Sequence, residues 1–526
     1  MIEENVGLPE GWVWTKLGEI RTDWSKGVEP NKFPEQQFEL YSVPSFDLRM
    51  PEIVPGSNIG SNKQTVENGT VLLCKINPRI NRAWVVGNSS DYPKIASTEW
   101  IPFFKLQDIV PAYLCYYLSL QTVRDYLAAH ASGVGGSLMR ITSRTITDYP
   151  FPLAPMKEQQ RIVAAIEQQF TRLDAGVAAL KRAQAKLKRY RAAVLKAAVE
   201  GKLTEAWRAE HPTTEPASNL LERILKERRV KWEADLKAKG KDPAKVKYIE
   251  PAKPDMEGLP ELPERWCWAT VEQLITYLRN GLPQKPETSP PGYRILRINA
   301  VRPMKVDLDE IRYLPLSERD AKAYFLDNGD ILFTRYNGSL ELLGVAGMVR
   351  SCSLPTLHPD KLIRVKTVLA EPLSSYVEMA SNVGVSRAHL ESRARTTAGQ
   401  TGISGSDIKQ IPIPLPPLAE QEQVIAEVEQ RLSVICQLET IVEANLKRAE
   451  RLRQSILKEA FAGRLVLQDP DDEPASELLE NIRKERQGRK KGIVENGRYT
   501  KVSGEPVKID VEGTRQVELW ESVGGG

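Results

Sequence analysis

An internal duplication of about 260 residues constrains this chain more than any other feature of its sequence. Short blocks recur in one order with a slowly changing offset: Leu8–Trp14 (LPEGWVW) returns as Leu262–Trp268 (LPERWCW), and Ile146–Pro155 (ITDYPFPLAP) returns as Ile408–Pro417 (IKQIPIPLPP). The stretches between the blocks barely match. The 526-residue chain is therefore expected to fold as two related units with shared boundaries and different interiors.

Each half changes character at a proline. Before Pro155 and Pro417 the sequence is rich in Pro, Gly, Tyr and Trp, and short apolar runs such as Thr70–Cys74 and Gly329–Thr334 are typical of strands. After these prolines Ala, Glu, Gln, Lys and Arg dominate, and Gly201 and Gly463 stand where a left-handed glycine ends a helix. We predict a helix of about 45 residues, nearly 70 Å long, in each half.

The two predicted helices carry an apolar row at heptad spacing, which favours a coiled coil. Its members are Leu173, Val177, Leu180, Leu187 and Val194 in the first helix, and Ile435, Val442, Leu452 and Ile456 in the second. Gln184 interrupts the first row. The alternative is that each helix packs only on its own globular domain.

The predicted fold class is α+β. Two globular mixed α/β domains are separated by two long antiparallel coiled-coil helices, and the whole forms a pseudo-two-fold internal repeat. The expected segments are a first domain at 1–154, a helical region with linker at 155–255, a second domain at 256–416, and a second helical region with a C-terminal tail at 417–526.

Composition excludes several classes of protein. Lys and Arg number 73 against 69 Asp and Glu, so the net charge of +4 leaves any nucleic-acid surface to be found locally. No apolar run approaches the ~18 residues of a membrane span, and the N-terminal segment has no apolar stretch of a signal peptide. The five cysteines are far apart and odd in number. We expect a cytoplasmic protein with reduced thiols.

Motifs of catalysis are also missing. None of the four histidines stands at metal-ligand spacing from another His or Cys, so no metal site is predicted. The sequence has no GxxxxGK[ST] phosphate loop and no Gly-x-Ser-x-Gly elbow, and no tetrapeptide typical of methyl transfer. We expect a binding protein with no catalytic residues and no cofactor of its own.

Basic and amide side chains follow equivalent strands in the two halves. Arg, Lys and Asn can each make two hydrogen bonds to a base edge in the major groove, and Arg on loops rich in Gly, Ser and Thr can hold phosphates. The candidate contacts to double-stranded DNA are Lys75, Asn77, Arg79, Arg82, Arg140 and Arg144 in the first half, and Arg335, Asn337, Arg387, Arg393 and Arg395 in the second. A solvated surface is the alternative for each.

The first long helix also contains a basic run. Seven cations between Lys181 and Lys196 have no acid among them, whereas the first part of the second helix is acidic. Antiparallel pairing would place these two parts side by side, which favours helix pairing. The other possible use of the run is contact with a DNA backbone.

The duplicated order of these segments resembles the specificity subunit of Type I restriction–modification enzymes. The resemblance rests on Pro155-Met156-Lys157-Glu158-Gln159 and Pro417-Leu418-Ala419-Glu420-Gln421 ahead of the long helices, on the two LPExW openings, and on the strands at Gly69 and Gly329. It covers nearly the whole chain except the last forty or so residues.

The resemblance implies a non-catalytic subunit whose two target-recognition domains each read one half of an asymmetric, split DNA sequence. It further implies that the helices set the unread gap, that two methyltransferase subunits dock on the chain, and that restriction/translocase subunits join them. S-adenosylmethionine, ATP and magnesium would then belong to the partners. A coiled-coil adaptor that binds no DNA, and a recognition subunit of a methyltransferase-only or Type II-like system, remain the alternatives.

Overall fold

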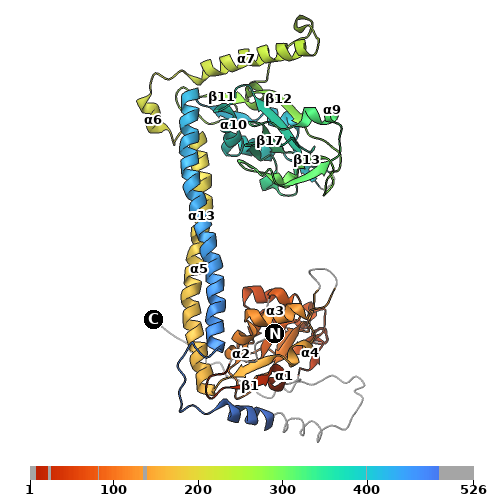
Figure 1. Cartoon of the computed structure of the whole chain (residues 1–526), viewed down its shortest axis with the longest axis vertical. Helices are drawn as coiled ribbons and strands as arrows, with labels where there is room; N and C mark the ends of the chain where they lie inside the picture. The colour runs from red at the N-terminus through yellow and green to blue at the C-terminus, as the bar shows by residue number, and fades with distance from the viewer. Residues whose placement is uncertain (1–6, 22–24, 81, 134–138, 398–399, 485–526) are drawn as a thin grey trace, which may run out of the picture. The chain divides into compact units, whose positions relative to one another are not determined.

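Two antiparallel strands close each globular domain just before its long helix begins. β1 (Val13–Lys16) pairs with β10 (Pro150–Leu153), and β11 (Cys267–Thr270) pairs in the same way with β24 (Pro412–Leu415). The computed structural model describes residues 7–21, 25–80, 82–133, 139–397 and 400–484. The chain divides into two compact units, unit 1 (Met1–Val177 with Lys447–Gly526) and unit 2 (Ala178–Leu446). Both units mix helices and strands (Figure 1).

In unit 1, a five-stranded sheet of order β2-β5-β8-β3-β4 accompanies a three-stranded sheet of order β7-β6-β9. The strands are β2 (Gly27–Val28), β3 (Gln37–Tyr41), β4 (Glu52–Pro55), β5 (Lys63–Thr65), β6 (Val71–Cys74), β7 (Ala83–Val85), β8 (Lys94–Ser97) and β9 (Trp100–Phe103). The short helices are α1 (Leu17–Ile20), α2 (Pro111–Leu118), α3 (Gln121–Ala129) and α4 (Ser143–Thr147), and residues 475–484 are also helical. The strand predicted at Thr70–Cys74 is thus confirmed as β6.

In unit 2, the central sheet has the order β12-β21-β17-β19, and smaller sheets have the orders β16-β13-β20, β14-β15 and β18-β23-β22. The strands are β12 (Ile275–Asn280), β13 (Tyr293–Leu296), β14 (Val301–Arg302), β15 (Lys305–Val306), β16 (Ile311–Leu314), β17 (Ile331–Thr334), β18 (Tyr336–Asn337), β19 (Ala346–Met348), β20 (Thr356–Leu357), β21 (Leu362–Thr367), β22 (Arg395–Thr397) and β23 (Gln400–Gly402). The shorter helices are α6 (Glu205–Glu210), α7 (Ala217–Ala238), α8 (Val271–Leu274), α9 (Glu318–Ala321), α10 (Leu373–Ser381), α11 (Gly384–Ser392) and α12 (Gly405–Lys409).

The two long helices are α5 (Met156–Val199) and α13 (Leu418–Phe461), each of 44 residues (Figure 1). Each begins directly after the proline that the sequence indicated. The residues that follow their ends, Gly201 and Gly463, have φ of 69° and 68°, a left-handed backbone that favours glycine. Both predicted helices are confirmed with their boundaries.

Within each unit the start of one long helix packs against the end of the other. In unit 1, Ile162 and Ile166 of α5 share a core with Ile456 of α13; in unit 2, Ala198 of α5 shares a core with Val424 of α13. The helices are therefore antiparallel in both units. Along the predicted row, Leu173, Val177, Leu180 and Leu187 are half-buried, and Val194, Ile435, Val442 and Ile456 are buried.

Leu452 does not lie on this row, and its assignment to the seam is wrong. Its side chain is 49% exposed, whereas Ala449 and Ile456 are buried. The next residue of the row after Ala449 is Arg453, four positions later in the heptad. The Arg453 guanidinium lies 4.3 Å from the ring centre of Phe170. A charged residue thus occupies the position where the sequence pattern suggested leucine.

A buried Trp–Glu hydrogen bond joins each long helix to its domain. Trp12 Nε1 donates to Glu158 Oε2 at 2.9 Å, and Trp266 Nε1 donates to Glu420 Oε2 at 2.8 Å. The Pro-x-x-Glu-Gln segment brings this about because it places the glutamate in the first helical turn, against the tryptophan of the LPExW opening. The same contact therefore recurs in both units.

Candidate nucleic-acid interface

A similar ladder of three paired chain segments follows an inner strand of a sheet in both units. In unit 2, β23 lies between β18 and β22, with Gly402 opposite both Tyr336 and Arg395. In unit 1, Arg140 forms the corresponding bridges to Ile76 and Ser132. The ladder follows β17 in one unit and β6 in the other, so the fold presents one backbone framework twice.

In unit 1 the ladder gathers several of the predicted DNA contacts. The backbone N–H of Asn77 donates to Met139 at 2.9 Å, and that of Ile141 donates to Lys75 at 3.0 Å. Lys75 Nζ donates to the Thr98 carbonyl at 2.6 Å, and burial lowers the pKa of its ammonium group. Lys75, Asn77 and Arg140 therefore stand together on neighbouring segments of one ladder.

Arg140 forms an ion pair with an acidic residue, and its neighbour Asn77 has a strained backbone. The guanidinium of Arg140 pairs with Glu99 at 2.9 Å while 58% of its side chain stays exposed. Asn77 has a left-handed backbone with φ of 47°, and its Oδ1 is buried without a hydrogen-bond partner among the described residues. A non-glycine residue in this conformation often marks a functional position.

The other three candidates of unit 1 lie around the ladder. Arg79 is exposed in the short helix η4 (Pro78–Ile80), and Arg144 is exposed on α4. The Arg82 side chain is only 13% exposed and lies 3.8 Å from Asp47. Arg79 and Arg144 thus remain accessible to a ligand, and Arg82 is mostly covered.

In unit 2 the ladder carries Arg335, Asn337 and Arg395. The Arg335 guanidinium lies 4.8 Å from the ring centre of Tyr336. Asn337 Oδ1 accepts the backbone N–H of Ser339 at 3.0 Å, and its side-chain amide donors have no partner among the described residues. Arg395 is exposed at the start of β22. A flat aromatic–guanidinium pair beside an amide is suited to contact with bases.

Arg387 and Arg393 differ in their surroundings. The Arg387 guanidinium donates to the carbonyls of Leu340 and Leu343 and pairs with Glu391 at 2.9 Å. These contacts favour a structural role that holds the 340–343 loop. Arg393 is exposed directly after α11, where it is open to a phosphate.

Comparisons with known proteins decide the family. No protein-family model matches the chain. The specificity subunit of the Type I restriction enzyme EcoKI from Escherichia coli K12 is 32% identical over 387 residues, which cover 72% of this chain and 72% of that protein. The chain belongs to the Type I restriction enzyme specificity subunits.

Further relatives agree with this membership. The EcoEI specificity subunit of Escherichia coli is 26% identical over 503 residues and covers 84% of this specificity subunit and 81% of its own length. A chain from a solved structure on the complex assembly and conformational transition of a Type I restriction–modification system has a TM-score of 0.59 at 18% identity, over 87% of this chain and 99% of its own. That likeness supports the mixed helix–strand fold.

In this specificity subunit the two ladders differ in side chains at equivalent places. Arg140 of unit 1 corresponds to Gly402 of unit 2, where a Cβ would come 2.6 Å from the Tyr336 ring. A charged residue in one unit is thus replaced by an aromatic ring lying over a glycine. Sequence reasoning missed Gly402 and Glu99; aligning the halves at Arg140 would have drawn attention to the glycine.

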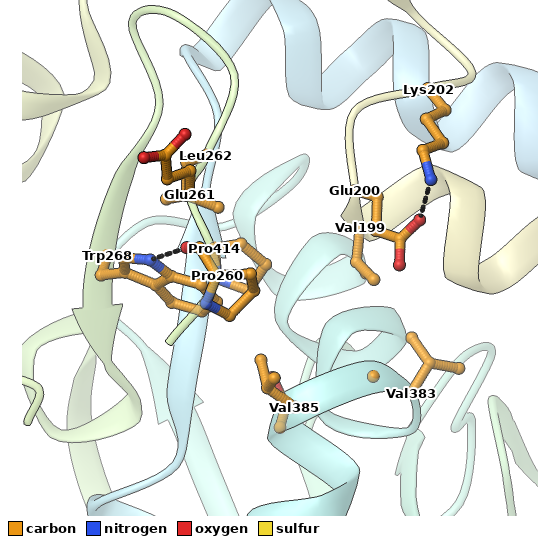
Figure 2. Close-up of a pocket in the computed structure, with 12 residues that line it drawn as sticks. Val199, Glu200, Lys202, Pro260, Glu261, Leu262, Trp268, Val383, Val385 and Pro414 are labelled. Atoms are coloured by element: carbon orange, nitrogen blue, oxygen red, sulfur yellow. Dashed lines mark hydrogen bonds and ion pairs between the residues drawn. The ribbon is translucent and has the colours of Figure 1, made fainter. Parts of the chain in front are cut away.

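Unit 2 also contains a pocket of about 330 Å³ where the end of α5 meets the domain. Val199, Trp268, Val383 and Pro414 line it, and Lys202 Nζ pairs with Glu200 at 2.7 Å (Figure 2). In unit 1, Gln454 Oε1 accepts the first N–H of α3 at 2.8 Å. The repeat places alanine, Ala192, at that position of α5, so the glutamine contact seen in unit 1 has no counterpart at the start of α11.

The described part of the chain contains no candidate metal site and no candidate membrane span. No group of three or more His, Cys, Asp or Glu side chains within it is arranged to hold a metal ion. No described helix is long and apolar enough to cross a membrane.

Proposed function

We propose that each unit reads one half of an asymmetric, split DNA sequence with its ladder of three paired segments. The observation that carries this proposal is the equivalence of the two backbones together with the difference between Arg140 and the Tyr336–Gly402 pair. Two readers of different half-sites need one framework with different side chains. Arg and Asn are the side chains that make paired hydrogen bonds to base edges.

The chain is proposed to be non-catalytic and to work in the cytoplasm, where it brings other subunits to DNA. Two methyltransferase subunits, and restriction/translocase subunits with them, are its expected partners. S-adenosylmethionine, ATP and magnesium are then bound by those partners. The related solved structure comes from work on the complex assembly of a Type I restriction–modification system, which supports the expectation of partner subunits.

The long helices are proposed to form one antiparallel coiled coil that fixes the unread gap between the half-sites. The antiparallel packing seen separately in unit 1 and in unit 2 supports this arrangement. Two weak readers on a stiff connection gain affinity through effective concentration, provided that the connection matches the spacing of the half-sites.

The test is co-expression of the chain with its candidate methyltransferase partner, followed by mapping of the modified bases. A bipartite modified sequence is expected. Arg395→Gln with Asn337→Ala should relax only the half-site read by unit 2, by about 10- to 100-fold in preference, since a lost base contact costs ~1–3 kcal/mol. The matched variant Arg140→Gln should relax only the other half-site.

Three results would contradict the proposal. Relaxation of the same half-site by both variants would show that the ladders do not read separate sequences. Methylation or cleavage by the purified chain without partners would show that it is itself an enzyme. A chain that assembles with the methyltransferase but gives no sequence preference would be an adaptor that binds no DNA.

A further inference from the structure

The outer face of α5 in unit 2 carries six exposed cations. This α5 cationic face consists of Lys181, Arg182, Lys186, Lys188, Arg189 and Lys196. The helix has no Asp or Glu between 178 and 199. Among the described residues, only Lys196 of the six has an acidic partner, Glu200 at 3.7 Å.

Helix pairing does not use these cations. At about 100° per residue they fall on the half of the helix opposite Leu180, Leu187 and Val194. Arg191 is the cation of this run that reaches the other helix, where it pairs with Glu439 at 2.8 Å. The pairing of a basic with an acidic half that the sequence suggested thus involves Arg191 and leaves the six others in solvent.

Two of the lysines face the side of α5 on which the domain of unit 2 is attached. Lys181 precedes Val199 by eighteen residues, about five helical turns, and Lys188 precedes it by about three. Val199 lies against the start of α11, where a Cβ on Gly384 would be 3.5 Å from Val199 Cγ2 (Figure 2). Lys181 and Lys188 therefore continue the row that contacts the domain.

The other half of the repeat keeps only part of this face: Arg448, Arg451 and Lys458 of α13 match Lys186, Arg189 and Lys196, and Glu450 stands where α5 has Lys188. Glu443 and Ala444 of α13 stand where α5 has Lys181 and Arg182. The backbone and seam of the two helices are nevertheless equivalent. Lys181, Arg182 and Lys188 are consequently not a requirement of the helical framework.

The chemistry of the face fits a polyanion better than a protein. Protein interfaces are anchored by buried aromatic or large apolar side chains. On the cationic half of the helix the other exposed positions are small, such as Ala185 and Ala192, and the exposed Tyr190 lies on the half that carries the apolar row. Nucleic-acid interfaces are polar and strongly positive. The face extends from Lys181 to Lys196, a rise of about 22 Å, which matches roughly six base pairs of duplex at 3.4 Å each.

We propose that the α5 cationic face binds backbone phosphates of double-stranded DNA in the unread gap, without regard to its sequence. The inference rests on the proposed function, because unit 2 brings the duplex to that side of α5. Binding there adds affinity and salt dependence, and leaves the choice of bases to the ladders.

The test uses the full chain assembled with its methyltransferase partner and a 30-base-pair duplex that contains the mapped target. The variant is Lys181→Gln, Arg182→Gln, Lys188→Gln and Arg189→Gln together. Since each lost phosphate contact lowers the slope of log Kd against log salt by about 0.9, the slope should fall by about two to four and the affinity at 0.15 M salt by about 10- to 1,000-fold. The preference for the target over other half-sites should not change.

Two controls make the result specific. Lys237→Gln, Lys241→Gln, Lys245→Gln and Lys247→Gln remove four exposed charges elsewhere in unit 2 and should leave the slope unchanged. Lys181→Arg with Lys188→Arg keeps the charge and should retain wild-type binding. Glutamine favours helix, so the four-fold variant is expected to fold, which circular dichroism checks.

Three outcomes are distinguishable. If the wild-type complex prefers its target and the salt slope of the variant is unchanged, this inference alone is overturned. If the variant loses the methyltransferase on purification and its salt slope is unchanged, the face binds a protein partner, and this inference is overturned as well. A wild-type complex without any target preference refutes the proposed function itself.

Discussion

At the scale of single residues, Glu158 and Glu420 occupy one position of the repeat, yet their carboxylates have different partners. Glu158 accepts from Trp12 and from Gln468 at 3.1 Å, and burial raises its pKa. Glu420 accepts from Trp266, from Thr204 at 2.7 Å and from the guanidinium of Arg208, which is only 18% exposed.

Replacement by glutamine is therefore expected to affect the two positions unequally. Glu420→Gln should lower the free energy of unfolding by about 2–3 kcal/mol, because Arg208 loses its counter-ion in a mostly buried place. Glu158→Gln keeps an acceptor for Trp12 and should cost about 1 kcal/mol or less. Urea unfolding of both variants measures the difference, and equal costs would contradict the importance of Arg208.

Because His358 is buried, we expect the free energy of unfolding to depend on pH. Its ring is fully buried, Nδ1 donates to the Tyr324 carbonyl at 3.1 Å, and burial lowers its pKa to about 4. The unfolded chain, with an ordinary pKa near 6.5, binds more protons between these values, so the free energy of unfolding falls as pH falls from 6.5 to 4.

Between pH 7.5 and 5.0 the loss due to His358 should be about 2 kcal/mol. His358→Gln, which can still donate to Tyr324, should remove that part of the pH dependence, as followed by urea unfolding at the two pH values. The exposed His211→Gln serves as the control. Identical pH dependence in wild type and His358→Gln would refute the assignment.

Residue type alone predicted part of the candidate interface. The strand ends of both halves contain Arg, Lys and Asn, and the structure places Lys75, Asn77 and Arg140 on one ladder. The sequence did not reveal that Arg387 would be bonded to the carbonyls of a nearby loop. A guanidinium has five donors, and which carbonyls satisfy them depends on contacts distant in sequence.

At the scale of elements, the buried row of α13 predicts which apolar residues stabilise it. Ile435 is 1% exposed and Leu452 is 49% exposed on the same helix. Ile435→Ala should therefore cost about 2–4 kcal/mol, from lost burial and a cavity, and Leu452→Ala about 1 kcal/mol or less. Urea unfolding of the two variants tests this, and similar costs would mean that the row has been placed wrongly.

The limits of the long helices could be read from the sequence because local signals fix them. Proline at the start and a left-handed glycine after the end act on the residues next to them. The phase of the row within α13 depends instead on what faces it. The contact of Arg453 with Phe170, remote in the chain, determines that Leu452 points outward, and no local signal encodes it.

At the scale of the whole molecule, α5 and α13 each begin in one unit and end in the other. If these helices set the unread gap, its length should follow the number of heptads. Arg191 pairs with Glu439 in unit 2, and Asp174 pairs with Arg453 in unit 1. Ala183 and Asn445 lie between these pairs, so an insertion after both residues preserves the packing on either side.

One heptad inserted at both positions lengthens each helix by about 10 Å, which corresponds to about three base pairs. The modified sequence mapped with the methyltransferase partner should then have a gap about three base pairs longer and unchanged half-sites, because the ladders lie far from the insertion in sequence. Replacing Ala178–Gln184 by another heptad of the same length is the matched control and should leave the gap as it was. A longer chain that still modifies the original spacing would show that something other than these helices measures the gap.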